Sequence, residues 1–239
     1  MSKIKQEALD MRCGAVHCLT EDVITRNNWD TVELPEIMAG CKRKVFSAKE
    51  IIYRESDHVD KVFIILNGMV KLLSYLPNGR ARIVGLHNRS HWLGLEGLVA
   101  RFYEHNAVAV DDVEVTYIPM TTLHLLEREN PQQYCQIMKQ GYKQLGQTDR
   151  WISDFSTGGI KSRVARLVEF LSRLEYGESS HMVDLLTVHE MADMLGVTPE
   201  SVSRILAEFK RNNTLHKLAS YSYEKYAIDF QRLQYEARQ

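Results

Sequence analysis

The sequence has few of the features that mark secreted or membrane-spanning proteins. Its 239 residues include four cysteines and five prolines, and four scattered cysteines are too few for a disulfide scaffold. No apolar run reaches the roughly 20 residues that a membrane-spanning helix needs. Residues 1–13 also lack the apolar centre of a signal peptide. We therefore expect a cytoplasmic protein with no membrane partner.

The charge of the chain is almost balanced. Thirty basic residues oppose 31 acidic residues, for a net charge of −1, so the sequence lacks the polybasic character that attracts nucleic-acid phosphates. Any DNA contact must therefore depend on the local placement of basic side chains. Seven of these, in the last third of the chain, could share one face: Lys161, Arg163, Arg166, Arg204, Lys210, Arg211 and Lys217.

No catalytic constellation stands out in the sequence. A hydrolytic or transfer enzyme would need a nucleophile, a base and a group that orients the base, and no such set is evident. The hydrophobic fraction of 44% is enough for a core, and the length fits one large domain or two modest ones. These observations favour a binding protein rather than an enzyme.

The clearest local pattern is a pair of helices within residues 187–211. Thr187 can cap the first helix, and Glu190 completes a capping box three residues later. Gly196 ends that helix because glycine takes the left-handed conformation without steric cost. Thr198 can then cap the second helix. Two helices with these caps and a short turn are typical of a helix-turn-helix.

The second helix of this pair presents polar side chains near its amino terminus. Glu200, Ser203 and Arg204 lie on its outer face, with Thr198 and Ser201 beside them. Arginine can bind a guanine edge, glutamate can accept from a cytosine amino group, and serine can serve several edges. The sequence thus predicts a DNA-reading face. The alternative is an ordinary helical hairpin with an exposed i,i+4 ion pair.

The residues from about 33 to 119 have a β-rich pattern. Short runs of β-branched and aromatic residues alternate with turn signals, of which Asn67-Gly68 and Pro77–Gly79 are the clearest. This pattern predicts an antiparallel barrel or jelly roll. A short helical stretch at 92–99 interrupts it, and a ligand could be sensed there.

A long helix is predicted to begin near Glu129–Pro131. Apolar and small residues recur along it at alternating spacings of three and four, which is the pattern of a seam between two helices. We expect this seam to form a dimer interface, although the helix could instead pack on its own barrel. The seam residues are Met138, Gly141, Leu145, Thr148, Ile152 and Phe155.

The chain is therefore expected to have an α+β fold with four parts. Residues 1–30 form an amino-terminal segment with cysteines, and 31–128 form an antiparallel β-barrel or jelly-roll sensor domain. Residues 129–157 form the dimerisation helix, followed by a hinge at Ser156–Gly159. Residues 158–239 form a winged helix-turn-helix, whose wing is two short strands within 214–228.

This order of parts resembles the CRP/FNR superfamily of bacterial transcription regulators. The resemblance is nearer to the FNR branch, which reads DNA with Glu-x-x-Ser-Arg, here Glu200, Ser203 and Arg204. It implies a cyclic-nucleotide-binding-like barrel and a homodimer that binds double-stranded DNA at an inverted TTGAT-type repeat. It also implies RNA polymerase as a partner and control by an effector, as activator or repressor.

The sensory half departs from the cyclic-AMP-binding members of that superfamily. These carry Gly-Glu in the inserted helix and Arg-Ser at the next strand, whereas this chain has Gly94-Leu95-Glu96 and His105-Asn106. Without the arginine that would clamp a cyclic phosphate, cyclic AMP is not the expected effector. The effector stays unidentified, and its pocket is predicted to include Trp92, Gly94, Glu96, His105, Asn106 and Tyr142.

The cysteines depart from the oxygen-sensing FNR proteins, which hold a [4Fe–4S] cluster with four cysteines. Cys18 matches the first ligand, but Glu21, Asn27 and Thr116 stand at the other three positions. A conventional cluster needs four thiolates and is not expected. Another metal or redox site that involves Cys13 and Cys18 stays open, beside the alternative of unpaired thiols.

Histidines in or near the barrel leave a haem open, since some relatives in that superfamily sense gases through haem. The alternative is that they are exposed or hydrogen-bonded histidines. The four are His58, His87, His91 and His105. Two further functions therefore stand beside the DNA-binding regulator: a haem- or thiol-based redox or gas sensor of the same family, and a sensor module with a protein-interaction output.

Overall fold

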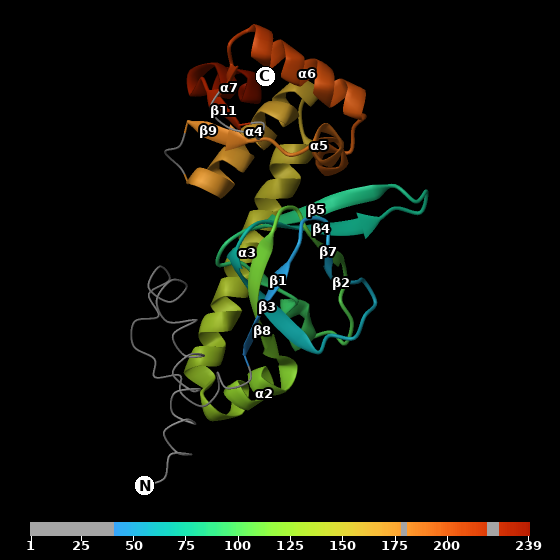
Figure 1. Cartoon of the computed structure of the whole chain (residues 1–239), viewed down its shortest axis with the longest axis vertical. Coiled ribbons are helices and arrows are strands. Elements are labelled where there is room, and N and C mark those ends of the chain that lie inside the picture. Colours follow the sequence, from blue (N-terminus) through green and yellow to red (C-terminus); the bar gives the residue numbers. More distant parts are fainter. Residues whose placement is uncertain (1–40, 178–180, 219–224) are drawn as a thin grey trace. The chain divides into compact units, whose positions relative to one another are not determined.

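The structure is a computed structural model that describes residues 41–177, 181–218 and 225–239. The predicted segment 1–30, with Cys13 and Cys18, lies outside these residues. The chain forms two compact units (Figure 1). Among these residues, one unit holds 41–72 together with Leu86–Gln144, and the other holds Leu73–Gly85 together with the described residues from Leu145 onward. Within the described ranges, no helix is long and apolar enough to cross a membrane.

Two four-stranded sheets account for the β-rich part of the chain and confirm the predicted antiparallel fold. The strand order is β1-β8-β3-β6 in one sheet and β2-β7-β4-β5 in the other. The central pair β3 and β8 runs antiparallel from Lys61↔Pro119 to Ile65↔Val115 (Figure 1). The strands are β1 (Lys42–Phe46), β2 (Ile51–Tyr53), β3 (Lys61–Asn67), β4 (Val70–Tyr75), β5 (Ala81–His87), β6 (Trp92–Leu93), β7 (Asn106–Ala109) and β8 (Val113–Pro119).

Aromatic side chains fill the interior of the first unit. The rings of Tyr53 and Tyr103 stack with their centroids 3.9 Å apart, and Phe63 stacks on Tyr53 at 5.8 Å. Gly94 has φ 78°, and a Cβ there would lie 2.9 Å from the Tyr103 ring. Glycine is therefore required at the turn into the short 3-10 helix η4 (Leu95–Leu98), which lies within the predicted helical insertion.

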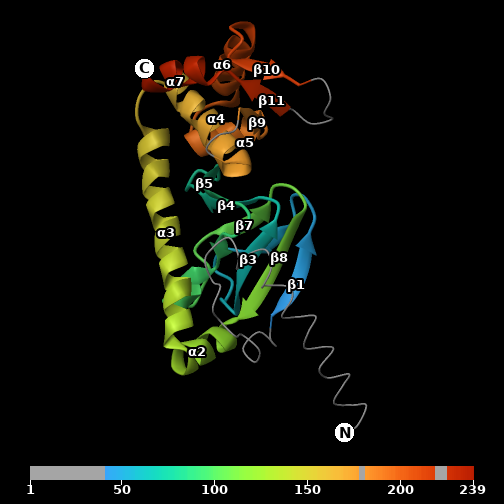
Figure 2. The ribbon, with the colours of Figure 1, turned by 90° about the vertical axis from the view of Figure 1, so that its left-hand side faces the viewer.

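Two helices follow β8. Helix α2 (Met120–Glu129) ends at Asn130, and α3 (Pro131–Ser156) then runs for 26 residues, as the sequence predicts (Figure 2). The Gln144 side chain accepts from the backbone N–H of Trp92 at 3.1 Å and donates to its carbonyl at 2.9 Å. The first half of α3 is thereby attached to the barrel of its own unit.

The second unit contains a three-stranded sheet in the order β10-β11-β9 and helices α4 to α7. Strands β10 and β11 confirm the predicted wing, whereas the sequence analysis predicted neither β9 nor the terminal helix α7. The elements are α4 (Ile160–Tyr176), β9 (Met182–Asp184), α5 (Val188–Leu195), α6 (Pro199–Arg211), β10 (Leu215–Lys217), β11 (Lys225–Ile228) and α7 (Phe230–Arg238).

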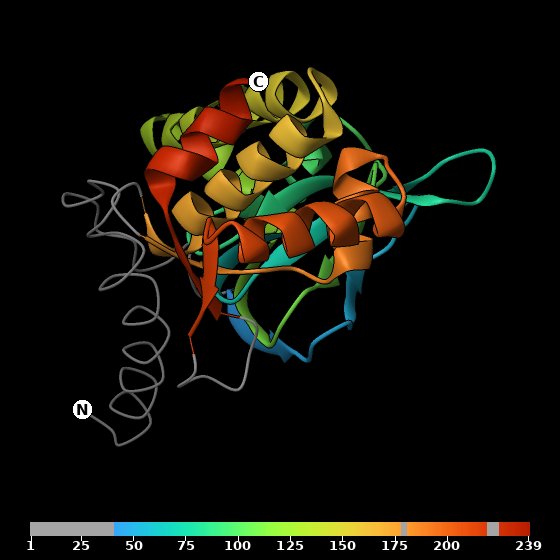
Figure 3. The same cartoon turned by 90° about the horizontal axis from the view of Figure 1, so that it is seen from above.

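Helix α4 lies between α6 and α7 (Figure 3). The ammonium group of Lys161 on α4 is 2.7 Å from carboxylate oxygens of both Glu208 on α6 and Glu236 on α7. Its pKa is raised, first by the hydrogen bond to Glu208 and then by that to Glu236. Lys161 therefore connects three helices rather than facing outward.

His87, at the end of β5, is an enclosed histidine whose Nδ1 atom has no hydrogen-bond partner among the described residues. Its ring centroid is 5.5 Å from that of His91. Burial, followed by the charges of His91 and His105, lowers the pKa of His87 to about 3. The folded protein thus keeps His87 neutral at pH values where an exposed histidine takes up a proton.

Acid should destabilise the folded chain through His87. Between its unfolded pKa of about 6.5 and its folded pKa of about 3, only the unfolded state binds the proton, so stability falls as pH falls. The expected contribution is up to about 1.4 kcal/mol per pH unit in that window and none above it. Urea unfolding from pH 7.5 to 4 should show a shallower loss in His87→Leu than in the wild type. The control is His124→Leu, at an exposed position of α2; equal slopes in all three proteins would contradict the role of His87.

The capping box of α5 gives a second prediction. Thr187→Ala removes the hydroxyl that accepts from the backbone N–H of Glu190 at 3.2 Å. It should lower the free energy of unfolding of the second unit by about 1 kcal/mol, because a helix donor loses its partner. Urea unfolding measures this loss. Thr187→Ser retains a hydroxyl and should stay close to the wild type, so an equal loss in both variants would exclude the cap as the cause.

Candidate nucleic-acid interface

The helix-turn-helix is formed by α5 and α6 with the caps that the sequence predicts. The hydroxyl of Thr187 accepts from the N–H of Glu190, and the Glu190 carboxylate accepts from the N–H of Thr187 at 3.1 Å. Gly196 ends α5 in the left-handed conformation with φ 64°. The Thr198 hydroxyl then caps α6 by accepting from the N–H of Ser201 at 3.4 Å. These contacts fix where α6 begins.

One face of α6 is buried and the other is open. The buried residues recur at helical spacing and hold the helix in its unit. They are Val202, Ile205, Leu206 and Phe209. On the open face Glu200, Ser203 and Arg204 are exposed within the first two turns. The pKa of Glu200 is lowered, first by a backbone hydrogen bond and then by Thr198, so its carboxylate is available as an acceptor.

Thr198 and Ser201 lie at the amino-terminal cap of α6, unlike the other predicted DNA-contact residues. Their hydroxyl oxygens are 3.1 Å apart, and Thr198 also accepts from the Ser201 backbone. Ser201 is half-buried, whereas Thr198 is exposed. Both side chains take part in the cap of α6. The outer face is therefore formed by Glu200, Ser203 and Arg204.

Three basic residues expected to share a DNA-facing surface instead make contacts inside the second unit. Lys161 pairs with Glu208 and Glu236. Arg163 and Arg166 donate to backbone carbonyls at the ends of helices. All three side chains are half-buried and are engaged by these contacts, so the exposed basic surface is formed by other residues. The exposed basic residues on α6 and β10 are Arg204, Lys210, Arg211 and Lys217.

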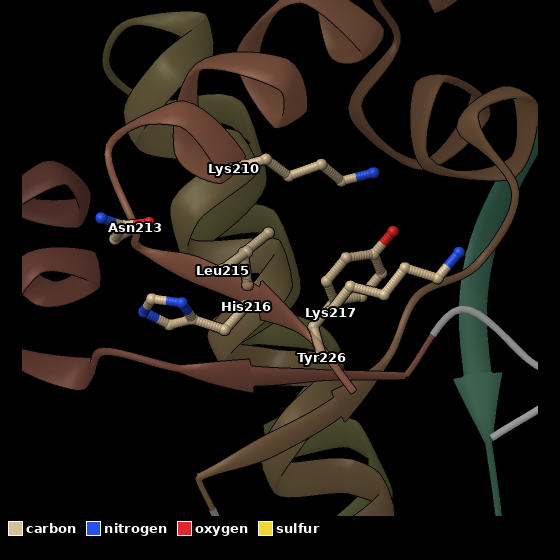
Figure 4. A pocket seen from close by; sticks show the side chains of 6 residues that line it. All are labelled: Lys210, Asn213, Leu215, His216, Lys217 and Tyr226. Atoms are coloured by element: carbon tan, nitrogen blue, oxygen red, sulfur yellow. The ribbon is translucent and has the colours of Figure 1, made fainter. Parts of the chain in front are cut away.

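A polar surface pocket of about 390 Å³ lies between the end of α6 and the wing (Figure 4). Lys210 extends over the Tyr226 ring, with 4.7 Å between its ammonium nitrogen and the ring centroid. His216 and Lys217 on β10 are exposed. The lining residues are Lys210, Asn213, Leu215, His216, Lys217 and Tyr226. The pocket therefore combines two ammonium groups and an imidazole, and the sequence analysis had identified only its lysines.

Four large apolar side chains of α3 are exposed at heptad-like spacing. The exposed fractions are 42% for Met138, 78% for Tyr142, 63% for Leu145 and 59% for Ile152. We call these four residues the α3 row. Tyr142, which the sequence analysis placed in an effector pocket, belongs to this row, because its side chain is largely exposed.

The other predicted seam residues differ. Phe155 is 3% exposed and packs edge-to-face on Trp151 and Phe170, with ring centroids 5.0 and 5.6 Å away, so its place on an open seam was wrong. Gly141 faces its own unit, since a Cβ there would lie 3.1 Å from Leu95. Thr148 is exposed.

The remaining predicted effector residues divide into two groups. Trp92 and Gly94 are buried parts of the barrel, and Asn106 accepts from the backbone N–H of Glu55 at 3.2 Å. Glu96 and His105 are both half-buried. Burial raises the pKa of Glu96, and the charge of His105 acts in the opposite direction.

A metal site would need at least three suitable side chains close together. In the described ranges 41–177, 181–218 and 225–239, no group of three or more histidine, cysteine, aspartate or glutamate side chains could hold a metal ion. Cys41 is half-buried and Cys135 is exposed. Cys13 and Cys18 fall outside these ranges, so the open question of a metal or redox site at that pair stays a prediction.

Comparison with known proteins matches each unit to a family. Residues 43–130 match the cyclic nucleotide-binding domain, and residues 165–234 match the Crp-like helix-turn-helix domain. The transcriptional activator protein anr of Pseudomonas aeruginosa is 27% identical over 169 residues, which is 70% of this chain and 69% of that protein. The nitrogen fixation regulation protein FixK of Bradyrhizobium diazoefficiens is 26% identical over 190 residues, covering 78% and 79%.

Solved structures show the same fold. FixK2 from Bradyrhizobium japonicum has a TM-score of 0.72 and 21% identity, covering 82% of this chain and 96% of that one. A transcriptional regulator of the CRP family from Thermus thermophilus has a TM-score of 0.68 and 22% identity, covering 82% and 97%. The relatives are regulators rather than enzymes, and the two domain matches occur in the expected order. This chain belongs to the CRP/FNR superfamily of DNA-binding transcription regulators.

Proposed function

We propose that this regulator binds, as a homodimer, an inverted repeat with TTGAT-like half-sites, under control of a signal received at the β-barrel. The observation that carries the proposal is the exposed row Glu200, Ser203 and Arg204 on α6. The three side chains are free of the buried face and lie near the amino terminus of a capped helix, which is the end that enters the major groove in helix-turn-helix proteins.

Each member of this row has a chemical role at a base edge. Arg204 can donate two hydrogen bonds to a guanine, Glu200 can accept from a cytosine amino group, and Ser203 can serve either kind of edge. The lowered pKa of Glu200 supports its role, because only the carboxylate is a pure acceptor. Base contacts of this kind determine which sequence is preferred.

Phosphate contacts are assigned to the pocket beside the wing. Lys210 and Lys217 present ammonium groups there, and His216 adds an imidazole (Figure 4). Such side chains bind the sugar-phosphate backbone and position the helix without reading sequence. They supply local positive charge in a chain whose net charge is −1, which answers the objection raised by the overall composition.

The α3 row supports a homodimer. Four large apolar side chains, each at least 42% exposed, follow one side of a 26-residue helix. Contiguous apolar surface of this kind is typical of an interaction site, and its spacing suits the same helix of a second copy. Two copies related by a two-fold axis would present two α6 helices to the two halves of an inverted repeat.

We propose that the effector contacts Glu96 and His105, the two half-buried ionisable groups among the predicted effector residues. A ligand that pairs with either group would change the balance between two conformations of the regulator, and DNA binding and effector binding would then influence each other reciprocally. Recruitment of RNA polymerase would follow DNA binding. This order of events makes the barrel the input and α6 the output.

The reading role of Arg204 can be tested by binding to a fluorescent duplex with the inverted repeat. Arg204→Ala should weaken binding to the repeat by about 5- to 150-fold for each half-site, equivalent to about 1–3 kcal/mol per contact, and leave binding to scrambled DNA nearly unchanged. Arg128→Ala, an exposed arginine of α2, is the control and should behave as the wild type. If Arg204→Ala keeps the wild-type preference for the repeat over scrambled DNA, the assignment of α6 as the reading element fails.

The dimer can be tested by sedimentation. Leu145→Glu puts a charge in the middle of the α3 row and should convert the dimer to a monomer, because an unpaired carboxylate at an apolar interface is costly. Binding to the full repeat should fall together with dimerisation. Gln136→Glu adds the same charge at an exposed position nine residues earlier on α3, on the opposite side of the helix. A Leu145→Glu protein that still sediments as a dimer would exclude this seam.

A further inference from the structure

The sequence predicts a flexible hinge at Ser156–Gly159, between α3 and α4. In the structure α3 ends at Ser156 and α4 begins at Ile160. Gly158 has φ 81°, and a Cβ there would lie 3.3 Å from a guanidinium nitrogen of Arg166. The glycines thus make a tight turn against an arginine of the following helix, rather than a loose linker.

Arg166 on α4 binds three backbone carbonyls from two other segments. Its Nε donates to the carbonyl of Asp154 at 2.7 Å, and one terminal nitrogen donates to that of Thr157. The other terminal nitrogen donates to the carbonyl of Ala237 at 3.1 Å, at the end of α7. One guanidinium group therefore holds the last turn of α3, the turn after it and the carboxyl-terminal helix.

Arg163, one turn earlier on α4, makes the corresponding connection to the helix-turn-helix. Its Nε donates to the carbonyl of Phe155 at 2.6 Å. A terminal nitrogen donates to the carbonyl of Leu195, which is the last residue of α5. Arg163 therefore joins the end of α3 directly to the point where α5 turns into α6. Hydrogen bonds from a charged guanidinium to carbonyls at helix ends are strong, and they complement the helix dipole.

Aromatic packing reinforces the same junction. Trp151 and Phe155 on α3 pack edge-to-face with Phe170 on α4, with ring centroids 5.5 and 5.6 Å from the Phe170 ring. The compact units accordingly divide inside α3, between Gln144 and Leu145, and not at the glycines. The part of α3 from Leu145 to Ser156 therefore belongs to the same compact unit as the helix-turn-helix.

We propose that Arg163 and Arg166 are positioning residues that determine which spacing between half-sites this regulator accepts. The inference rests on the proposed function as a dimer that reads an inverted repeat. In such a dimer α3 belongs to the two-fold interface and α6 enters the groove, so the α3–α4 junction fixes the separation and direction of the two α6 helices. Neither arginine contacts a base in this arrangement.

The reason is geometric. Inserting one base pair between half-sites moves them apart by about 3.4 Å and rotates one relative to the other by about 35°. A junction held by five hydrogen bonds to carbonyls resists that change, so mis-spaced sites should bind weakly. Without the guanidinium groups, the glycine turn should behave as the hinge that its sequence predicts, and each α6 helix could adapt to several spacings.

The experiment measures the affinity of full-length protein for a set of duplexes that differ only in the spacer between inverted half-sites. The wild type should prefer one spacer by at least about tenfold over spacers one or two base pairs longer or shorter. Arg163→Lys, Arg163→Ala and Arg166→Ala should flatten this preference to about threefold or less, because lysine lacks the rigid planar fork of the guanidinium group and alanine has no donor. Arg173→Ala, at the far end of α4, is the matched control.

A duplex with a single half-site separates a positioning role from a general folding role. Arg163→Lys should bind it with the wild-type affinity, since α6 and its reading face are unchanged. Spacer preference equal to that of the wild type in all three variants would overturn the inference, and so would loss of single-half-site binding in Arg163→Lys. If the wild type binds neither the single half-site nor any inverted repeat, the proposed function itself fails, and the inference with it.

Discussion

The carbonyl groups in the last turn of a helix have no partner within that helix, and the fold must satisfy them from elsewhere. In the second unit α4 meets part of this need for three other helices. The ends of α3, α5 and α7 all present carbonyls to Arg163 and Arg166 of α4. Lys161 on the same helix adds ion pairs to α6 and α7. The arrangement of α6 and its exposed face therefore depends on the first two turns of α4.

The barrel is held together by apolar and aromatic packing rather than by hydrogen bonds to helix ends. A few polar groups are buried within it. Tyr53, Phe63 and Tyr103 fill the interior, and Gly94 is required for the close approach of the short 3-10 helix. Glu96 and His87 have pKa values shifted toward their neutral forms by burial. Polar groups held away from water gain from any ligand that supplies a hydrogen-bond partner.

Features that depend on residues close together in the sequence could be predicted, whereas features that depend on contacts between distant residues could not. The capping box, the turn at Gly196 and the exposed Glu200, Ser203 and Arg204 follow from residues within a few positions of one another, and the structure places them as expected. The two sheets likewise follow from alternation and turn residues, but their strand order does not. Gly158-Gly159 indicates a flexible hinge, but Arg166 packs against this turn, and the sequence pattern does not show that contact. The heptad spacing puts Phe155 on the seam, whereas its ring packs on Phe170 of the next helix.

The division of α3 between two compact units also bears on how such a regulator can be taken apart or recombined. A fragment cut at the glycine turn would leave Phe170 without Trp151 and Phe155, and two arginines without their carbonyls on α3. A fragment that begins at Leu145 keeps all of these contacts within one piece. The winged helix-turn-helix therefore keeps its contacts with α3 only when it carries Leu145–Ser156 with it. A change of partner at the seam and a change of target sequence would then be inherited together.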